Sequence, residues 1–130
     1  MKTRNDPRHI LRIKKMQSLF SLSFHDKKAN IGRNQVGDII KHIARIDKFI
    51  EKSAPAFPVD KIAKTDLAIL RLAVYELLFI KKTPPKVVID EAVEMAKEFG
   101  ADTSSSFVNG VLGNILTKKG GTWKKKFLNL

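Results

Sequence analysis

Apolar side chains recur along the chain with the spacing of amphipathic α-helices, and the strict alternation of a β-strand is almost absent. This periodicity predicts helices over about residues 7–24, 35–52, 65–80, 85–99 and 104–116, with a short helical turn over 59–63. The helix at 65–80 is apolar on nearly every side, which is typical of a buried central element. The pattern therefore predicts an all-α fold of about six helices.

Proline, glycine and polar residues mark the ends of these helices. Pro7 suits the first turn of the first helix, and the polar stretch "HDKKANIGRN" predicts a linker after it. The two prolines of "SAPAFP" enforce a loop before residue 59. Gly100 is expected to cap the helix before it, and Ser104 is expected to be the N-cap of the last helix.

The dipeptide Asn109-Gly110 is a strong turn signal, yet it lies inside the apolar pattern of the last helix. The pattern continues on both sides of it, so the helix is expected to continue as well. Glycine in a helix interior costs about 1 kcal/mol relative to alanine, so some benefit should offset it. Gly110 and Gly113 would offer a bare strip that another helix can approach closely. Asn109 is then either a structural hydrogen-bonding residue or a contact residue.

Length and composition favour one intracellular domain. A chain of 130 residues with 43% hydrophobic content can build one real core, and the absence of cysteine excludes disulfides and thiolate metal sites. None of the three histidines forms an i, i+4 pair that could hold a metal on one helix, so neither a metal nor another cofactor is expected. No apolar run is long enough to span a membrane, and no secretory signal precedes the first helix. We therefore expect a cytoplasmic protein without a membrane partner.

The net charge of +12 is concentrated at the two ends of the chain. Residues 1–15 hold six basic side chains against one acid, and residues 117–130 hold five basic side chains and no acid. Such clusters are expected of a protein that binds nucleic acid or another polyanion, because each cation that meets a phosphate releases counterions. The alternative is that basic ends only keep the protein in solution.

The helix at 85–99 carries an acidic face of Asp90, Glu91, Glu94 and Glu98. Paired carboxylates can serve acid–base catalysis or bind a metal. No histidine or nucleophile is placed beside them in the sequence, which favours a solvated face or a strip that binds a partner protein. No phosphate-binding loop or nucleophile–base pair is visible elsewhere, so an enzyme is not expected.

Three motifs in fixed order carry a resemblance to a known family. They are "TDLAILRLAVYELLF", "PPKVVIDEAVEMAKEFG" and "SSSFVNGVLGNIL", and in order and spacing they resemble the bacterial NusB family of transcription antitermination factors. The resemblance covers residues 35–116 well and residues 8–24 loosely. It implies a compact helical bundle of two packed subdomains without enzymatic activity. The single domain would span residues 1–117, with a basic first helix at 7–24, a second subdomain at about 59–117 and a basic tail at 118–130.

The resemblance also implies a function and a set of contact residues. Family members bind boxA-type single-stranded RNA together with ribosomal protein NusE, acting on the transcription elongation complex to favour read-through and ribosomal RNA transcription. The resemblance implies RNA contacts in two places. Arg8 and Arg12 match the arginine-rich start of the family's first helix. Phe107 in the last helix matches the aromatic residue of the FVNG motif. The expected RNA-binding residues are Arg4, Arg8, Arg12, Lys15, Phe107 and Asn109, and the expected protein-partner residues are Phe20, Asp66, Glu76, Glu91 and Glu94.

The chain departs from the family pattern in the linker after the first helix and at Gly113, where relatives have an acidic residue after FVNGVL, and its tail is also unusual. Only about ten residues separate the first helix from Gln35, where relatives have an additional helix, so an apolar face is expected to be exposed and to invite a homodimer or another partner. The tail carries Trp123 and Phe127 among lysines, which could stack on RNA or fold back onto that face. The alternatives to antitermination are a stand-alone ribosomal-RNA-binding domain that does not depend on NusE, and a helical protein-interaction module.

Overall fold

The computed structural model describes residues 6–24 and 33–117, which form helices joined by loops. Arg4 and the tail with Trp123 and Phe127 lie outside these residues. In chain order the elements are α1 (Pro7–Leu22), α2 (Arg33–Lys41), α3 (Ile43–Ser53), the 3₁₀ turn η1 (Val59–Lys61), α4 (Lys64–Val74), the π-helical segment η2 (Tyr75–Ile80), α5 (Pro85–Phe99) and α6 (Ser104–Thr117). The prediction of an all-α fold with six helices is confirmed.

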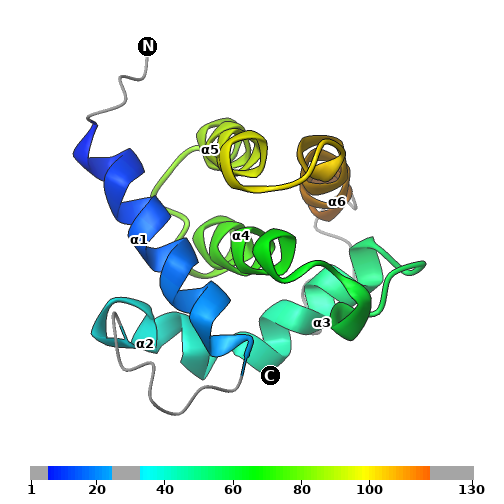
Figure 1. The fold of residues 1–130 in the computed structure, drawn as a ribbon, viewed down its shortest axis with the longest axis horizontal. Helices are drawn as coiled ribbons and strands as arrows, with labels where there is room; N and C mark the ends of the chain where they lie inside the picture. Colours follow the sequence, from blue (N-terminus) through cyan, green and yellow to red (C-terminus); the bar gives the residue numbers. More distant parts are fainter. Residues whose placement is uncertain (1–5, 25–32, 118–130) are drawn as a thin grey trace.

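Helix α4 is the centre of the bundle, as its all-round apolar sequence predicts. It packs against α1, α3, α5 and α6, which surround it in Figure 1. Eight of its eleven residues are buried, and Ala68, Ile69, Leu70 and Val74 expose nothing. Burying one Leu or Ile side chain stabilises a fold by about 1.5–3 kcal/mol, so α4 contributes a large part of the hydrophobic stabilisation. No helix in the described ranges is long and apolar enough to cross a membrane.

The prediction of one helix over residues 35–52 is wrong, because the helix is interrupted at His42, which separates α2 from α3. His42 has φ −108° and ψ 9°, and its ring stacks on Phe79 with 4.8 Å between ring centroids. The apolar pattern gives no sign of the break, since Ile39 at the end of α2 and Ile46 in α3 both reach the core. The chain therefore has one more helix before residue 54 than the sequence suggested, and this helix, α2, packs against α1.

The helix predicted to run to residue 80 changes its winding at Tyr75. From Tyr75 to Ile80 the backbone is π-helical, and it ends at Lys81, which has a left-handed φ of 58°. Single π turns interrupt α-helices rarely and occur often at functional positions. Here the wider turn carries Glu76, whose carboxylate accepts a hydrogen bond from Arg12 of α1.

The turn between α5 and α6 depends on glycine for space rather than for a left-handed conformation. Gly100 is the C-cap of α5, as expected, and its N–H donates to the Ala96 carbonyl oxygen at 2.9 Å, but its backbone is extended, with φ −96° and ψ −169°. A Cβ at this position would lie 2.6 Å from the Ser104 Cβ and 2.7 Å from the Ala96 carbonyl oxygen. Ser104 is the first residue of α6, and its Oγ accepts a hydrogen bond from the Ala101 N–H. Ser104 is therefore not the N-cap, since the carbonyl of Thr103 receives the first helical hydrogen bond, from Phe107.

Among the described residues, no other helix approaches the two glycines of α6 closely. A Cβ built on Gly110 or on Gly113 meets no heavy atom within 4 Å. The helix runs through Asn109-Gly110 as expected, but the expected helix–helix contact is wrong. The tertiary hydrogen bond of this helix comes instead from Asn114, whose Nδ2 donates to the carbonyl oxygen of Ser53 at 3.1 Å.

Replacement of Gly110 by alanine is expected to raise the free energy of unfolding by about 0.5–1 kcal/mol. The residue is helical and exposed, and its missing Cβ would touch nothing, so only the entropy of the unfolded chain changes. Urea denaturation followed by circular dichroism measures the change. Gly100→Ala is the opposite control, because its Cβ collides with Ser104 and should lower stability. A loss of stability in Gly110→Ala would contradict the open surface described above.

Candidate nucleic-acid interface

The basic start of α1 is fixed by an N-cap. The Asp6 side chain accepts a hydrogen bond from the Arg8 backbone N–H at 2.8 Å, and Pro7 occupies the first turn, where no N–H is needed. The Arg8 guanidinium also donates to the Asp6 carboxylate at 3.0 Å. These hydrogen bonds from Arg8 lower the pKa of Asp6 to about 2. Asp6 therefore stays ionised at neutral pH and holds the first turn in place.

The outer face of α1 carries three cations alongside the exposed apolar side chains of Ile10 and Leu11. The Arg8 side chain is 83% exposed, Lys14 is exposed and Lys15 is half-buried. Lys14 was not among the expected RNA-binding residues. Its position next to Lys15 and two residues before Met16 could have indicated that its side chain is exposed. A cleft of about 320 Å³ beside Arg8 is lined by the three acids Asp6, Asp90 and Glu91 and by the two arginines Arg8 and Arg12, so its acids outnumber its cations. The outer face, rather than this cleft, is the part of α1 that attracts phosphate groups.

Arg12 does not belong to this outer face. Its guanidinium donates to the Glu76 carboxylate through Nε at 2.9 Å and Nη2 at 2.8 Å, and the two side chains are only 12% and 16% exposed. This hydrogen bonding raises the pKa of Arg12. The sequence analysis expected Arg12 to contact RNA and Glu76 to contact a partner protein. In the structure the two side chains instead form an ion pair with each other, between α1 and η2.

Two of the other expected partner-binding acids are also inside the protein. Asp66, in the first turn of α4, is 8% exposed, and its Oδ1 has no hydrogen-bond partner among the described residues. Glu91 is 4% exposed. Burial on this scale is at odds with direct contact to a partner protein. Glu94 is exposed on α5, and Phe20 is half-buried, packing edge-on against the exposed Phe24 at 5.0 Å.

An aromatic pair lies where the FVNG motif begins α6. Phe107 is half-buried and packs edge-on against Phe57, with ring centroids 5.3 Å apart. Phe57 comes from the proline-rich loop before η1 and is 49% exposed. The sequence analysis missed Phe57, since nothing in the order of residues links that loop to α6. Asn109 is exposed, and its side chain makes no hydrogen bond within the described ranges, which argues against a structural role.

The expected RNA-binding residues therefore fall into two groups on different parts of the surface. Figure 1 shows α1 and α6 on opposite sides of α4 and α5. Arg8 and Lys15 belong to the first side, and Phe107 and Asn109 belong to the second. A single nucleotide cannot touch both groups, so only an extended strand could.

A second basic surface follows α2 and α3, which the sequence analysis also missed. Arg45, Lys48 and Lys52 are spaced by three and four residues on one face of α3, and Lys41 ends α2 just before the break at His42. Arg45 lies over the ring of Phe79 at 5.7 Å. Asp47 on the same helix is paired with Arg71 through two hydrogen bonds of 2.9 Å, so it does not oppose these cations. The spacing of the cations was visible in the sequence, but charges on a helix usually mark only its solvated face.

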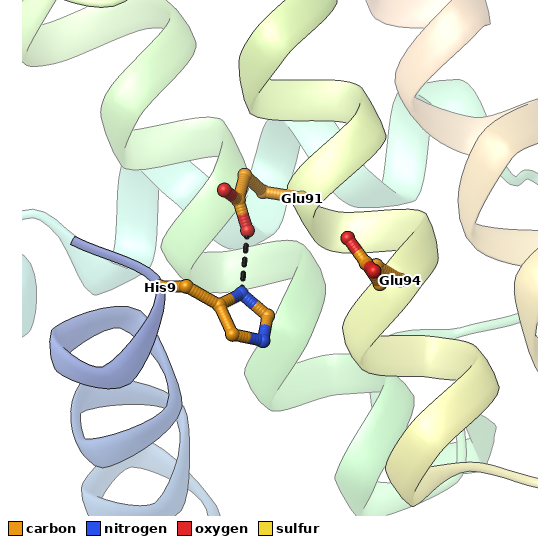
Figure 2. Close-up of side chains that lie close together, drawn as sticks. All are labelled: His9, Glu91 and Glu94. Carbon is orange, nitrogen blue, oxygen red and sulfur yellow. Dashed lines mark hydrogen bonds and ion pairs between the residues drawn. The ribbon is translucent and has the colours of Figure 1, made fainter. Parts of the chain in front are cut away.

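The acidic face of α5 does have a histidine beside it, contrary to expectation. Figure 2 shows His9 of α1 lying against Glu91 and Glu94 of α5. The His9 Nδ1 is 2.7 Å from the Glu91 Oε2, and both side chains are less than a tenth exposed. The two residues are 82 positions apart, so nothing in the order of residues predicted this contact.

Comparisons with known proteins agree with this architecture. The family model described as "NusB family" matches residues 3–117. The transcription antitermination protein NusB of Chloroflexus aggregans is 40% identical over 131 aligned positions, which cover 85% of this chain and 87% of that protein. The solved structure of NusB from T. maritima superposes with a TM-score of 0.76 at 33% identity, covering 97% of this chain and 99% of the other. The superposition covers nearly all of both chains, and the expectation of a member that lacks one helix stays a prediction.

A further solved structure shows the same fold in an assembly. Its title is "Crystal Structure of Antitermination Factors NusB and NusE in complex with dsRNA", and it superposes with a TM-score of 0.73 at 24% identity, covering 85% of this chain and 96% of the other. The family match spans all six helices, and the identity with relatives extends over most of the chain. The chain is thus a member of the NusB family of transcription antitermination proteins, which are not enzymes.

Proposed function

We propose that the chain binds boxA-type single-stranded RNA together with ribosomal protein NusE, and that it promotes read-through by the transcription elongation complex, chiefly in ribosomal RNA operons. The observation that carries the proposal is the exposed basic face of α1 in a chain that matches the family over residues 3–117. Arg8, Lys14 and Lys15 would hold phosphates there. Phe107 with Phe57 would supply a surface for stacking unpaired bases at the far side of the bundle.

The NusE-binding surface is proposed on the exposed residues of α5 rather than on its buried acids. Glu94 and Asp90 are exposed there, while Glu91 is enclosed by α1. An acidic strip of this kind suits a basic ribosomal protein through charge complementarity. Phe20 and Glu76 would act on this surface only indirectly, through the packing of α1.

Fluorescence anisotropy of a labelled boxA-type RNA and of a scrambled RNA, each with and without NusE, tests the proposal at two salt concentrations. Preferential binding of boxA that NusE strengthens is expected. Equal binding of both RNAs, indifferent to NusE, would instead favour a stand-alone ribosomal-RNA-binding domain. Absence of RNA binding would favour a protein-interaction module.

The paired change Arg8→Ala with Lys15→Ala is expected to weaken boxA binding roughly tenfold and to reduce the salt slope by about 1.4, which is the loss of two phosphate contacts to a single strand. Both side chains reach solvent, so circular dichroism should show unchanged helix content. The matched control removes two cations from the second basic surface, as Lys41→Ala with Lys48→Ala. An equal loss in both double variants would mean that only total charge matters and would contradict the assignment to α1.

A further inference from the structure

The side of α3 that faces away from the core carries most of the second basic surface. Ile46 and Phe49 expose nothing and anchor the helix in the core, whereas Lys48 and Lys52 are exposed and Arg45 is half-buried. From Arg45 to Lys52 the helix rises about 10 Å, at about 1.5 Å per residue. Phosphates follow one another at about 3.4 Å along a stacked strand, so this length matches about three nucleotides.

The acids of α2 and α3 cancel only part of this positive charge. Asp47 is held by Arg71 at 2.9 Å, and the two side chains are only 20% and 13% exposed. Asp38 lies 3.8 Å from Lys41, but both side chains are more than three-quarters exposed. An exposed pair of this kind contributes little and opens at low cost. With Glu51, which is also exposed, two acids share the surface with four cations.

Aromatic rings lie directly beside these cations. The ring of Phe79 stacks on His42, with centroids 4.8 Å apart, and on Tyr75, with centroids 6.0 Å apart. The Arg45 guanidinium lies over Phe79 at 5.7 Å, and all three rings are half-buried. A basic groove with interleaved aromatic rings is typical of proteins that hold single-stranded nucleic acid. A helix face that is merely solvated needs no such neighbours for its cations.

The end of α3 adjoins the aromatic pair of α6. The Phe57 N–H donates to the Ala54 carbonyl oxygen at 2.9 Å, so the loop after α3 stays close to the end of that helix. Phe57 in turn packs on Phe107 at 5.3 Å, and Asn114 of α6 donates to the Ser53 carbonyl oxygen. The cations of α3 therefore continue from the surface on which unpaired bases are proposed to stack.

We propose that the second basic surface binds the phosphates of RNA that flanks the boxA-type segment, where the strand leaves Phe57 and Phe107. The inference rests on the proposed function, because the boxA-type segment would fix the strand at Phe107. Contacts to phosphate carry no sequence information, so flanking RNA of any sequence would bind. The cations that would meet successive phosphates are Lys41, Arg45, Lys48 and Lys52.

Fluorescence anisotropy of the full chain with three labelled RNAs tests the inference. They are the boxA-type segment alone and the same segment extended by about ten unstructured nucleotides at its 5′ end or at its 3′ end. One of the two extensions is expected to tighten binding roughly tenfold at low salt and to steepen the salt slope by about 2, which corresponds to three more phosphate contacts. A changed extension sequence should give the same gain.

The double variant Lys41→Ala with Lys48→Ala is expected to remove most of the gain from the extension and to leave the affinity for the boxA-type segment alone unchanged. Both side chains are exposed, so circular dichroism should not change. The matched control is Lys86→Ala with Lys97→Ala, two exposed lysines of α5, which lies across α4 from α3 in Figure 1. This control should keep the full gain.

Three outcomes overturn the inference while the proposed function stands. They are no gain from either extension, a full gain in the variant of Lys41 and Lys48, and an equal loss in the variant of Lys86 and Lys97. The last of these would mean that only total charge matters. A boxA-type segment that binds no better than a scrambled one would overturn the proposed function, and this inference with it.

Discussion

Replacing Arg12 by alanine is expected to lower the free energy of unfolding by about 3 kcal/mol, because it leaves the Glu76 carboxylate uncompensated at a largely buried position. Both side chains are less than a fifth exposed and share hydrogen bonds of 2.8 and 2.9 Å. Urea denaturation at neutral pH measures the loss. RNA binding by Arg12→Ala should fall only as far as the folded fraction falls.

Three further variants separate structure from RNA contact in this prediction. Arg12→Lys keeps the charge but loses the planar pair of donors, so part of the stability should be lost as well. Arg12→Met combined with Glu76→Met removes both charges and should recover most of the stability, because replacing a buried ion pair by apolar groups is often neutral. Arg8→Ala is the exposed counterpart and should weaken RNA binding with little change in stability. Loss of RNA binding in Arg12→Ala at full stability would show that Arg12 contacts RNA directly.

Replacing Phe107 by alanine is expected to weaken boxA binding by about tenfold, since stacking one base on an aromatic ring contributes about 1–3 kcal/mol. The ring is only half-buried, so the protein should remain folded at 25 °C. Anisotropy titrations at constant salt measure the affinity, and the salt slope should not change, because no phosphate contact is lost.

Phe57→Ala distinguishes the two roles open to Phe107. If Phe107 stacks on a base and Phe57 supports it edge-on, Phe57→Ala should weaken binding less than Phe107→Ala does. Phe107→Leu keeps apolar volume without an aromatic face, so it should preserve stability but not affinity. Unchanged affinity in all three variants would assign Phe107 to packing alone.

Helix positions were predictable because apolar periodicity reports burial along one element. The patterns of α4 to α6 predicted those helices closely, and the all-round apolar sequence of α4 correctly indicated its central place. The break at His42 was not predictable in this way. The His42 ring at the break stacks on Phe79, which is distant in sequence, while the apolar pattern continues on both sides of the break.

The candidate site was harder to predict because charge in a sequence does not reveal its partner. Arg8 and Arg12 are one helical turn apart, yet one is exposed and the other is bound to Glu76, 64 positions further along the chain. Glu91 and Glu94 differ in the same way, with the first enclosed by α1 and the second in solvent. A glycine in a helix is also hard to interpret from the sequence, because the absence of a side chain is compatible with close helix packing and with an open surface. We expected Gly110 to serve close helix packing, whereas in the described residues it lies on an open surface.

The two halves of α1 are held to the bundle by different forces. In the second half Met16 and Leu19 are buried in the core. In the first half Ile10 and Leu11 are exposed, only Ile13 packs against the core, and polar contacts by His9 and Arg12 supply the rest of the attachment. Local opening begins where few apolar contacts must be broken. Backbone amide hydrogens of the first half should therefore exchange with solvent well before those around Leu19. The segment that carries Arg8 is thus able to detach and re-form while the rest of the bundle stays closed.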